Sequence, residues 1–267
     1  MIAAMQMYDW PEVQGTHDAF WAVAAEALRD AGINAPPAMT RFAELSGTWA
    51  RPDLLVGQTC GLPFSRGLCG DAVPFARGDY RIEGATGGTY TSAIIVRRDG
   101  PDALEGLPDK TLSGMTAAVN EWGSQSGCNA LADAMGSAAG RPQVFGGVKI
   151  SGSHRQSATL VADGAADIAA LDAVAWDLYS HLEPARRENL KAIGWTRPMP
   201  ALPFITAPAN LRLAEPLATA LAEAARQVSG PGLPRAILPA DADTYAPVRE
   251  MDLSLKGAVL APGTRPF

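Results

Sequence analysis

The sequence is poor in cysteine, histidine and charged residues. Its three cysteines, Cys60, Cys69 and Cys128, do not have the Cys-x-x-Cys spacing of a structural zinc site. Its three histidines match neither His-Glu-x-x-His nor another zinc motif. The charged fraction is 19%, below the usual quarter, which argues against a disordered chain. We therefore expect a folded protein with no metal site and no cofactor.

Long apolar runs and runs of like charge are also missing. No segment approaches the roughly 18 uninterrupted apolar residues that span a bilayer. The net charge is −6 and no five consecutive residues carry like charges, so nucleic acid is not an expected partner. The N-terminus, M-I-A-A-M-Q-M-Y-D-W-P-E, lacks the basic start and the longer apolar stretch of a signal peptide. This predicts a chain that stays in the cytoplasm or has lost a leader.

Several enzyme motifs are absent as well. The loop 123–127 reads G-S-Q-S-G, with Gln125 where a serine hydrolase has its nucleophile. There is no G-x-x-x-x-G-K-[ST] loop for a nucleoside triphosphate, and no G-x-G-x-x-G follows the first predicted strand. One reactive pair stays open, because Cys128 at a predicted helix start and His154 as its base would suit a thiol enzyme.

Apolar residues make up 47% of the chain, enough for sizeable cores. Strand-like and helix-like segments alternate, which predicts an α/β fold with mainly parallel strands. Apolar periodicity predicts helices that end at Gly32, Gly140 and Gly164. The expected strands cover 2–7, 53–57, 72–82, 89–98, 115–119, 143–150 and 168–171, and the expected helices cover 16–31, 127–139, 154–163, 173–190 and 213–228.

The chain is predicted to cross twice between two domains. The first crossing lies near 95–100, and the second lies in W-T-R-P-M-P-A-L-P-F-I-T (195–206), because proline does not fit a central strand. We expect a two-lobed α/β protein in which 1–95 plus 201–267 form the first lobe and 96–200 the second. The Pro- and Gly-rich residues after 229 are expected to wrap the surface. Since ligands bind beyond strand carboxyl ends, we predict a site in a cleft between the lobes.

Polar and aromatic residues follow the predicted strands. Two loops, 120–127 and 151–154, also precede predicted helices, whose N-termini hold anions through free N–H groups. Serine and aspartate at helix starts are also common N-caps, so these residues have a purely structural alternative. The tryptophans can be core residues or aromatic walls of a site. The candidate ligand contacts are Tyr8, Trp10, Gln58, Thr59, Tyr90, Asn120, Ser124, Gln125, Ser126, Gly127, His154 and Asp172.

The order of these stretches resembles the phosphate-, phosphite- and phosphonate-binding proteins of ABC importers, a type II periplasmic solute-binding family. The resemblance runs from residue 2 to about residue 228. The matching stretches are Q-T-C-G (58–61), Y-T-S-A-I-I-V (90–96), N-E-W-G-S-Q-S-G (120–127), S-G-S-H-R-Q-S (151–157), A-D-G-A-A-D-I-A-A-L-D (162–172) and P-M-P-A-L-P (198–203).

The resemblance implies two lobes that close on a small solute without performing chemistry. It implies a membrane permease of an ABC importer as the partner, a monomer, and a periplasmic location. It also implies that the loop 124–127 grips an oxyanion, and that further contacts come from Tyr8, Tyr90, His154 and Asp172.

Two residues depart from the family pattern. Gln125 stands where a hydroxyl residue is common, and Glu121 would oppose a dianion unless it points away. A zwitterionic or neutral solute therefore stays open, with its amine on Tyr8, Trp10 or Asp172. Two other functions also stay open: an enzyme on the same scaffold that uses Cys128 and His154, and a cytoplasmic sensor.

Overall fold

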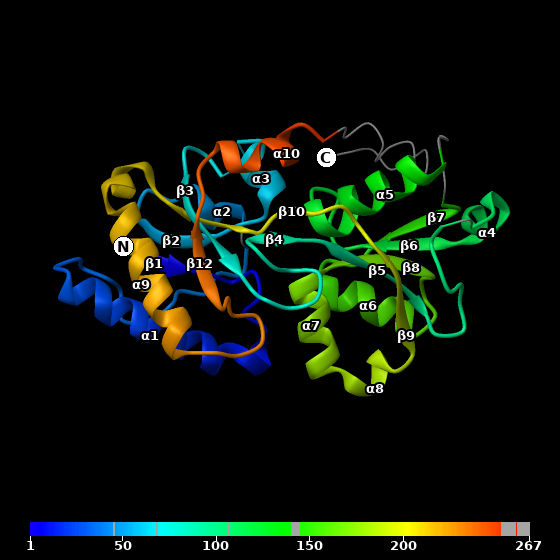
Figure 1. The fold of residues 1–267 in the computed structure, drawn as a ribbon, viewed down its shortest axis with the longest axis horizontal. Helices are drawn as coiled ribbons and strands as arrows, with labels where there is room; N and C mark the ends of the chain where they lie inside the picture. Colours follow the sequence, from blue (N-terminus) through cyan, green and yellow to red (C-terminus); the bar gives the residue numbers. More distant parts are fainter. Residues whose placement is uncertain (45, 68, 106, 140–144, 252–259, 261–267) are drawn as a thin grey trace. The chain divides into compact units, whose positions relative to one another are not determined.

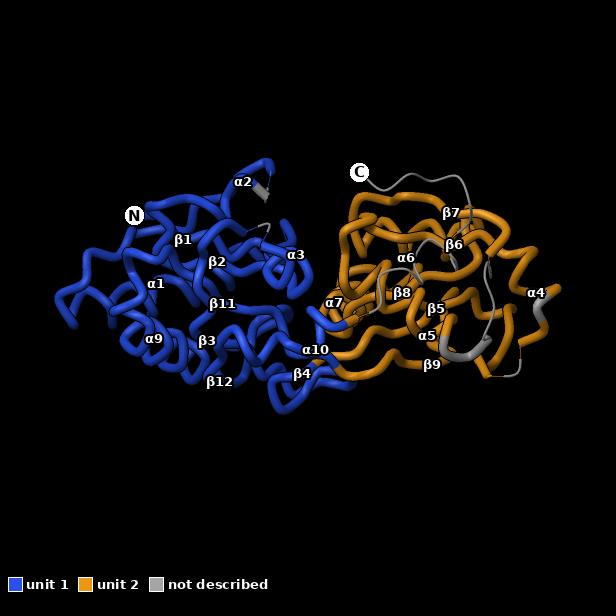
Figure 2. The backbone as a smooth tube through the Cα atoms, turned by 90° about the horizontal axis from the view of Figure 1, so that it is seen from above, with its two compact units in different colours: residues 1–89, 199–250 blue, residues 90–198, 251–267 orange. Residues whose placement is uncertain are grey.

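The computed structural model describes residues 1–44, 46–67, 69–105, 107–139, 145–251 and 260. They form two compact units, coloured separately in Figure 2. Unit 1 comprises 1–89 and 199–250, and unit 2 comprises 90–198 with Met251 and Leu260. The chain thus passes between the units after residues 89, 198 and 250, whereas the sequence led us to expect passages near 95–100 and 200 only.

Unit 1 contains a mixed five-stranded sheet in the order β1-β2-β11-β3-β12 (Figure 1). β1 and β2 are parallel, and the other neighbouring pairs are antiparallel. The strands are β1 (Ile2–Ala4), β2 (Leu54–Gln58), β3 (Val73–Asp79), β11 (Pro203–Thr206) and β12 (Ala236–Pro239). The helices are α1 (Gln14–Asp30), α2 (Ser46–Trp49), α3 (Gly61–Ser65), α9 (Ala214–Gln227) and α10 (Ala246–Arg249), with 3-10 turns at Pro11–Val13, Pro208–Leu213 and Asp243–Tyr245.

The main core of unit 1 lies between the sheet and the helices α1 and α9. Phe20, Ala24 and Leu28 recur at four-residue steps on α1 and are buried there. They pack in one cluster with Leu217 and Leu221 of α9 and with apolar side chains of β2, β3 and β11. A smaller cluster contains Trp49, Leu54, Cys69 and Ile205.

Unit 2 has its own mixed five-stranded sheet, in the order β7-β6-β8-β5-β9. β6 is parallel to both β7 and β8, whereas β5 is antiparallel to β8 and β9. The strands are β5 (Ser92–Arg97), β6 (Thr116–Val119), β7 (Gly147–Ile150), β8 (Ile168–Asp172) and β9 (Leu190–Trp195). The helices are α4 (Asp109–Gly114), α5 (Ala130–Ala139), α6 (His154–Ala162), α7 (Ala173–Leu182) and α8 (Pro184–Arg187). A separate two-stranded sheet is formed by β4 (Thr89–Tyr90) and β10 (Met199–Pro200).

Side chains of the unit 2 sheet alternate between two buried faces. Ile94 and Val96 of β5 pack in a cluster with Leu131 and Met135 of α5. Helix α6 packs against β5, β6 and β8. Leu260, which is 0% exposed, belongs to the same cluster as Leu131. Leu260 therefore helps to complete the core of unit 2.

Four strands, β9, β10, β11 and β12, were not predicted from the sequence. The span 195–206 was read as a crossing because of its prolines, yet β11 lies between β2 and β3 in the sheet. Pro203 is the first residue of that strand, where a missing N–H costs no ladder bond, and its carbonyl accepts the Thr59 N–H. β9 and β12 were missed as well, because 190–195 and 236–239 lack a clear two-residue alternation.

The sheets are mixed, which corrects the expectation of mainly parallel strands. Each of the strands β5 and β11 begins within a few residues of the point where the chain enters its unit from the other one. Neither strand is therefore preceded by the crossover helix that would make it parallel to its neighbours, and both are antiparallel. The predicted helices and strands otherwise have counterparts among the described residues. Gly32 and Gly164 follow α1 and α6 with φ of 77° and 73°, as expected of helix stops. Gly140 lies outside the described residues.

The α1–α9 packing predicts a large difference between two leucines of unit 1. Leu221 on α9 is 1% exposed, whereas Leu211 is 50% exposed. Leu221→Ala should lower the free energy of unfolding by roughly 2–5 kcal/mol, because it leaves a cavity in the core. Leu211→Ala should change it by less than about 0.5 kcal/mol. Urea unfolding measures both, and equal losses would contradict this description of the core.

Candidate functional site

Three parallel strands bring three loops together at one edge of the unit 2 sheet. Because β6 pairs in parallel with β7 and β8, their carboxyl ends lie side by side. Asn120 and Ser151 directly follow β6 and β7, and Asp172 is the last residue of β8. Backbone bonds join the first two loops, since the N–H of Ser151 donates to the Val119 carbonyl and that of Gly152 donates to the Asn120 carbonyl, both at 2.8 Å. The parallel pairing of these strands therefore brings the candidate residues of unit 2 to one edge of the sheet.

The loop after β6 turns into a helix at Ser124. This residue caps the π-helical turn η2 (Gln125–Asn129), and its hydroxyl accepts the Gly127 N–H at 3.2 Å. Its carbonyl accepts the backbone and side-chain N–H groups of Asn129. The turn continues directly into α5. Its first N–H groups have no acceptor inside the helix and carry partial positive charge, so they suit an anion.

Gly127 allows a close approach between this turn and the other loops. A Cβ at residue 127 would lie 2.0 Å from Asn120 Oδ1 and 3.1 Å from His154 Cε1. Asn120 Oδ1 is itself buried, and no hydrogen-bond partner for it lies among the described residues. Glycine is therefore required at this position if the three loops are to keep their arrangement.

Ser126 and His154 form a hydrogen-bonded pair. Ser126 Oγ lies 2.8 Å from His154 Nε2, and the serine is 5% exposed. His154 opens α6, which Ser153 caps by accepting the Gln156 N–H at 3.1 Å. Burial lowers the pKa of His154 to about 4, and a hydrogen-bonding effect of the Ala170 backbone only partly opposes this. The imidazole is therefore neutral at neutral pH.

The Gln125 side chain contacts Met251, the residue at which the chain re-enters unit 2. It is 0% exposed, and its Nε2 donates to Met251 Sδ at 2.7 Å. Its Oε1 is buried, with no hydrogen-bond partner in the part of the chain that the structure describes. The residue that departs from the family pattern thus packs against Met251, and a ligand contact from its side chain stays a prediction.

Asp172 caps α7. Its Oδ1 accepts the N–H groups of Val174 at 2.8 Å and Ala175 at 3.4 Å. The structural alternative given for Asp172 is thus confirmed, and a ligand contact stays a prediction. Ser92 of β5 pairs directly with Asp172, and the Thr91 carbonyl accepts the Ala173 N–H. Tyr90, buried at 4% exposure, lies two residues before Ser92.

The candidate residues of unit 1 divide into two environments. Tyr8 meets Tyr80 edge-on, with ring centroids 5.5 Å apart, and Gln58 Nε2 donates to the Tyr80 hydroxyl at 3.1 Å. Thr59 is fully buried, and its hydroxyl lies 3.5 Å from Cys69 Sγ. Trp10 is half-buried and precedes the 3-10 turn Pro11–Val13. Tyr8 and Gln58 are therefore linked through Tyr80, whereas Thr59 faces the interior.

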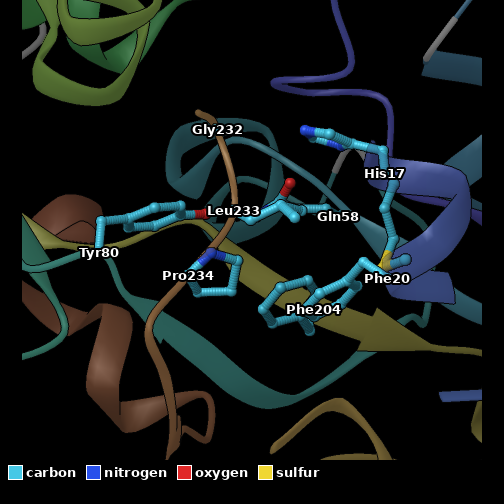
Figure 3. Close-up of a pocket in the computed structure, with 9 residues that line it drawn as sticks. His17, Phe20, Gln58, Tyr80, Phe204, Gly232, Leu233 and Pro234 are labelled. Atoms are coloured by element: carbon cyan, nitrogen blue, oxygen red, sulfur yellow. Dashed lines mark hydrogen bonds between the residues drawn. The ribbon is translucent and has the colours of Figure 1, made fainter. Parts of the chain in front are cut away.

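A small pocket in unit 1 adjoins this cluster. Figure 3 shows Tyr80 directed toward Gln58, with His17 on the other side of Gly232 and Leu233. The sequence analysis selected Gln58 because it follows a predicted strand. Tyr80 directly follows β3 and was missed because the predicted strand 72–82 extends past Asp79, where β3 ends. The pocket is lined by Met5, His17, Phe20, Gln58, Tyr80, Phe204 and Gly232–Pro234.

Cys128 lies in the apolar core of unit 2. It is 0% exposed and belongs to the apolar cluster with Leu131. The group that contacts His154 Nε2 is the Ser126 hydroxyl. Cys60 and Cys69 are likewise buried, and all three cysteines are free thiols in the structure. The arrangement does not favour the Cys128 and His154 enzyme. Among the described residues, no group of acidic, histidine or cysteine side chains is arranged to hold a metal ion.

Comparison with known proteins decides the family. Residues 60–253 match the family described as ABC transporter, phosphonate, periplasmic substrate-binding protein. The match spans more than half of the 267 residues. The chain belongs to this family. It is thus a substrate-binding protein of the phosphonate ABC-transporter type, a family of binding proteins rather than enzymes. No curated protein matches the sequence.

Solved structures show that the fold of this substrate-binding protein is shared. PhnD1 from Prochlorococcus marinus (MIT 9301), in complex with methylphosphonate, is 16% identical, with a TM-score of 0.73 over 95% of this chain and 97% of the other. A binding protein component of an ABC phosphonate transporter from Pseudomonas aeruginosa is 15% identical, with a TM-score of 0.70 over 96% and 86%. XAC2383 from Xanthomonas citri bound to ATP is 18% identical, with a TM-score of 0.64 over 94% and 98%.

These likenesses show the α/β fold of two-lobed periplasmic binding proteins. Family membership implies a small-molecule ligand, a membrane permease as partner and a periplasmic setting. Within the described ranges, no helix is both long and apolar enough to cross a membrane.

The crowding at Gly127 predicts a position-specific cost for a methyl group. Gly127→Ala should lower the free energy of unfolding by roughly 1–3 kcal/mol, because the new Cβ overlaps Asn120 Oδ1. Gly123→Ala is the matched control in the same loop, since a Cβ there meets nothing within 4 Å. It should change stability by less than about 0.5 kcal/mol. Chemical unfolding of both variants tests this, and a harmless Gly127→Ala would contradict the described packing.

The lowered pKa of His154 predicts a pH dependence of stability. Its pKa is about 4 in the folded chain, against an ordinary value of 6.5. Between these values the unfolded state binds more protons, so this contribution is complete above pH 6.5 and is lost as the pH falls toward 4. The loss should be at most roughly 3 kcal/mol. Urea unfolding between about pH 7.5 and pH 4.5 measures it.

Two variants separate His154 from other titrating groups. Burial also lowers the pKa of His17, which adds to the same window. His154→Gln should therefore flatten only part of the pH dependence. His181→Gln, at an exposed histidine of α7, should keep the wild-type slope. A wild-type slope in His154→Gln would contradict the assignment.

Proposed function

We propose that this protein binds a small phosphonate or a related phosphorus oxyanion at the strand-end loops of unit 2, and delivers it to the membrane permease of an ABC importer. The observation that carries the proposal is the convergence of the η2 N-terminus with the Ser126–His154 pair. Unpaired N–H groups and hydroxyls hold an oxyanion without a metal or a lysine. The Prochlorococcus relative in complex with methylphosphonate makes that compound the first ligand to test.

The same geometry favours an oxyanion over an amine as the group that unit 2 holds. The Asp172 Oδ1 already accepts two N–H groups of α7. An amine there would compete with these caps, whereas an oxyanion at η2 meets N–H groups that have no acceptor in the helix. A zwitterionic solute is the second candidate. Comparing methylphosphonate with 2-aminoethylphosphonate distinguishes the two.

The remaining parts of the proposal follow from family membership. The protein acts as a monomer in the periplasm, carries its solute without changing it, and releases it to the permease. Size-exclusion chromatography with light scattering tests the monomer. Phosphorus NMR of methylphosphonate incubated with the protein tests the absence of turnover. A product that forms at a catalytic rate would overturn the receptor function.

Removing either member of the Ser126–His154 pair should weaken ligand binding. We expect Ser126→Ala and His154→Ala each to lose roughly 1.5–3 kcal/mol of binding free energy, or about 10- to 150-fold in affinity, because each removes a hydrogen bond to a charged ligand. Isothermal titration calorimetry with methylphosphonate, phosphite and phosphate measures the loss.

Matched controls are available in the same unit. Ser113→Ala on α4 and His181→Ala on α7 change exposed residues and should bind as the wild type does. Thermal unfolding with ligand checks that the variants are folded, since a bound ligand raises the melting temperature by mass action. Wild-type affinity in both Ser126→Ala and His154→Ala would show that the solute binds elsewhere.

A further inference from the structure

The turn η2 is held in place by side chains from distant parts of the sequence. It is a single π-helical turn, a rare form of helix that is frequent at functional sites, and all five of its residues are buried. Hydrogen bonds with Ser124, Asn129 and His154 support it from nearby loops. A further contact comes from Met251, near the end of the chain.

Met251 anchors the side chain of Gln125, the first residue of η2. Gln125 is 0% exposed and Met251 is 5% exposed, so their contact is shielded from water. Nε2 of Gln125 donates to the Met251 Sδ at 2.7 Å, whereas Oε1 of Gln125 has no hydrogen-bond partner in the described chain. Removing the sulfur would therefore leave a buried amide without this bond, which costs free energy.

The C-terminal segment also reaches the core beneath this turn. Leu260 is 0% exposed and belongs to the same apolar cluster as Cys128 of η2 and Leu131 and Met135 of α5. The two described residues of unit 2 that follow residue 250, Met251 and Leu260, thus contact η2 or share its core. This segment therefore supports the element whose N-terminus holds the oxyanion in the proposed function.

The position of Gln125 makes its anchoring relevant to binding. Gln125 lies between Ser124, which caps the turn, and Ser126, which is bonded to His154. The first N–H groups of the turn, which have no acceptor inside the helix, belong to this stretch of backbone. Fixing the Gln125 side chain restrains the direction of these groups. A restrained donor binds more tightly than one that the ligand must first order, because ordering costs conformational entropy.

We propose that Met251 is a positioning residue of the oxyanion site and acts through Gln125. The inference rests on the proposed function and adds to the site a residue that is 126 positions away from Gln125 in the sequence. The sulfur is required as a hydrogen-bond acceptor, and the bulk of the methionine side chain alone does not replace it. The ligand itself is held by the N–H groups of η2 and by the Ser126–His154 pair.

Two substitutions of Met251 separate the acceptor from the bulk of the side chain. Met251→Leu keeps most of the volume but removes the sulfur, so the affinity for methylphosphonate should fall about 3- to 10-fold. Met251→Gln keeps an acceptor, and its amide can also donate to the unpaired Gln125 Oε1, so it should retain at least the wild-type affinity. Isothermal titration calorimetry measures the affinities, and urea unfolding checks that both variants are folded.

Met135→Leu is the matched control. Met135 is 1% exposed in the same apolar cluster, and its sulfur makes no hydrogen bond within the described ranges. The variant should bind as the wild type does, even if its free energy of unfolding falls. An equal loss of affinity in Met135→Leu and Met251→Leu would mean that core packing alone matters, which overturns the inference.

Exchanging the two partners tests the contact independently of Met251→Leu, should that variant not fold. Gln125→Met removes the donor and should weaken binding, and adding Met251→Gln restores a bond in the reverse direction and should recover the affinity. In the Gln125→Met background, Met251→Leu should have no further effect, because the bond is already absent. Failure of the exchange to recover affinity, or a full additional loss in the second pair, overturns the inference.

The remaining outcomes distinguish the inference from the proposed function. If Met251→Leu binds as the wild type does while Ser126→Ala weakens binding, the inference is overturned and the proposed function stands. Equal losses in Met251→Leu and Met251→Gln also overturn the inference alone. If the wild type binds neither methylphosphonate, phosphite nor phosphate, the proposed function and the inference fall together.

Discussion

The parallel register of β6, β7 and β8 is the constraint on which the unit 2 site depends. It places the ends of three strands, separated by up to about fifty residues of sequence, at one edge of a sheet. The first strand end adds the N-terminus of η2, the second adds His154, and the third adds the Asp172 carboxylate that caps α7. Gly127 keeps the components close, since any side chain there would overlap Asn120 and crowd His154.

Burial determines the electrical character of this site. The strand ends supply serine, asparagine, a histidine and the carboxylates of Glu121 and Asp172, and no charged side chain contributes to the pKa shift of His154. Ion pairs of unit 2, such as Arg155 with Glu183 and Arg197 with Asp133, join residues outside these loops. The site thus relies on oriented amides and hydroxyls, which keep their direction when the solvent is excluded.

The sequence predicted the helix starts that follow the strands of unit 2 better than it predicted the sheets. The Ser and Gly stretch at 120–127 and the S-G-S-H of 151–154 indicate helix starts after apolar strands. The contact between Ser126 and His154 follows because both loops lie at the same edge of the unit 2 sheet. Strand order and direction depend on long-range pairing, which local patterns do not encode. Pro203 shows this, because proline argues against a strand interior but is tolerated at its first residue. The Gln125 contact with Met251 joins residues 126 positions apart and has no local signal.

The seating of Leu260 in the unit 2 core has a consequence for how the chain is made. Domains usually fold in the order of their synthesis. Here the apolar cluster that contains Ile94 also contains Leu260, and the Gln125 side chain donates a hydrogen bond to Met251. The core of unit 2 is therefore complete only after both segments of unit 1 have been translated.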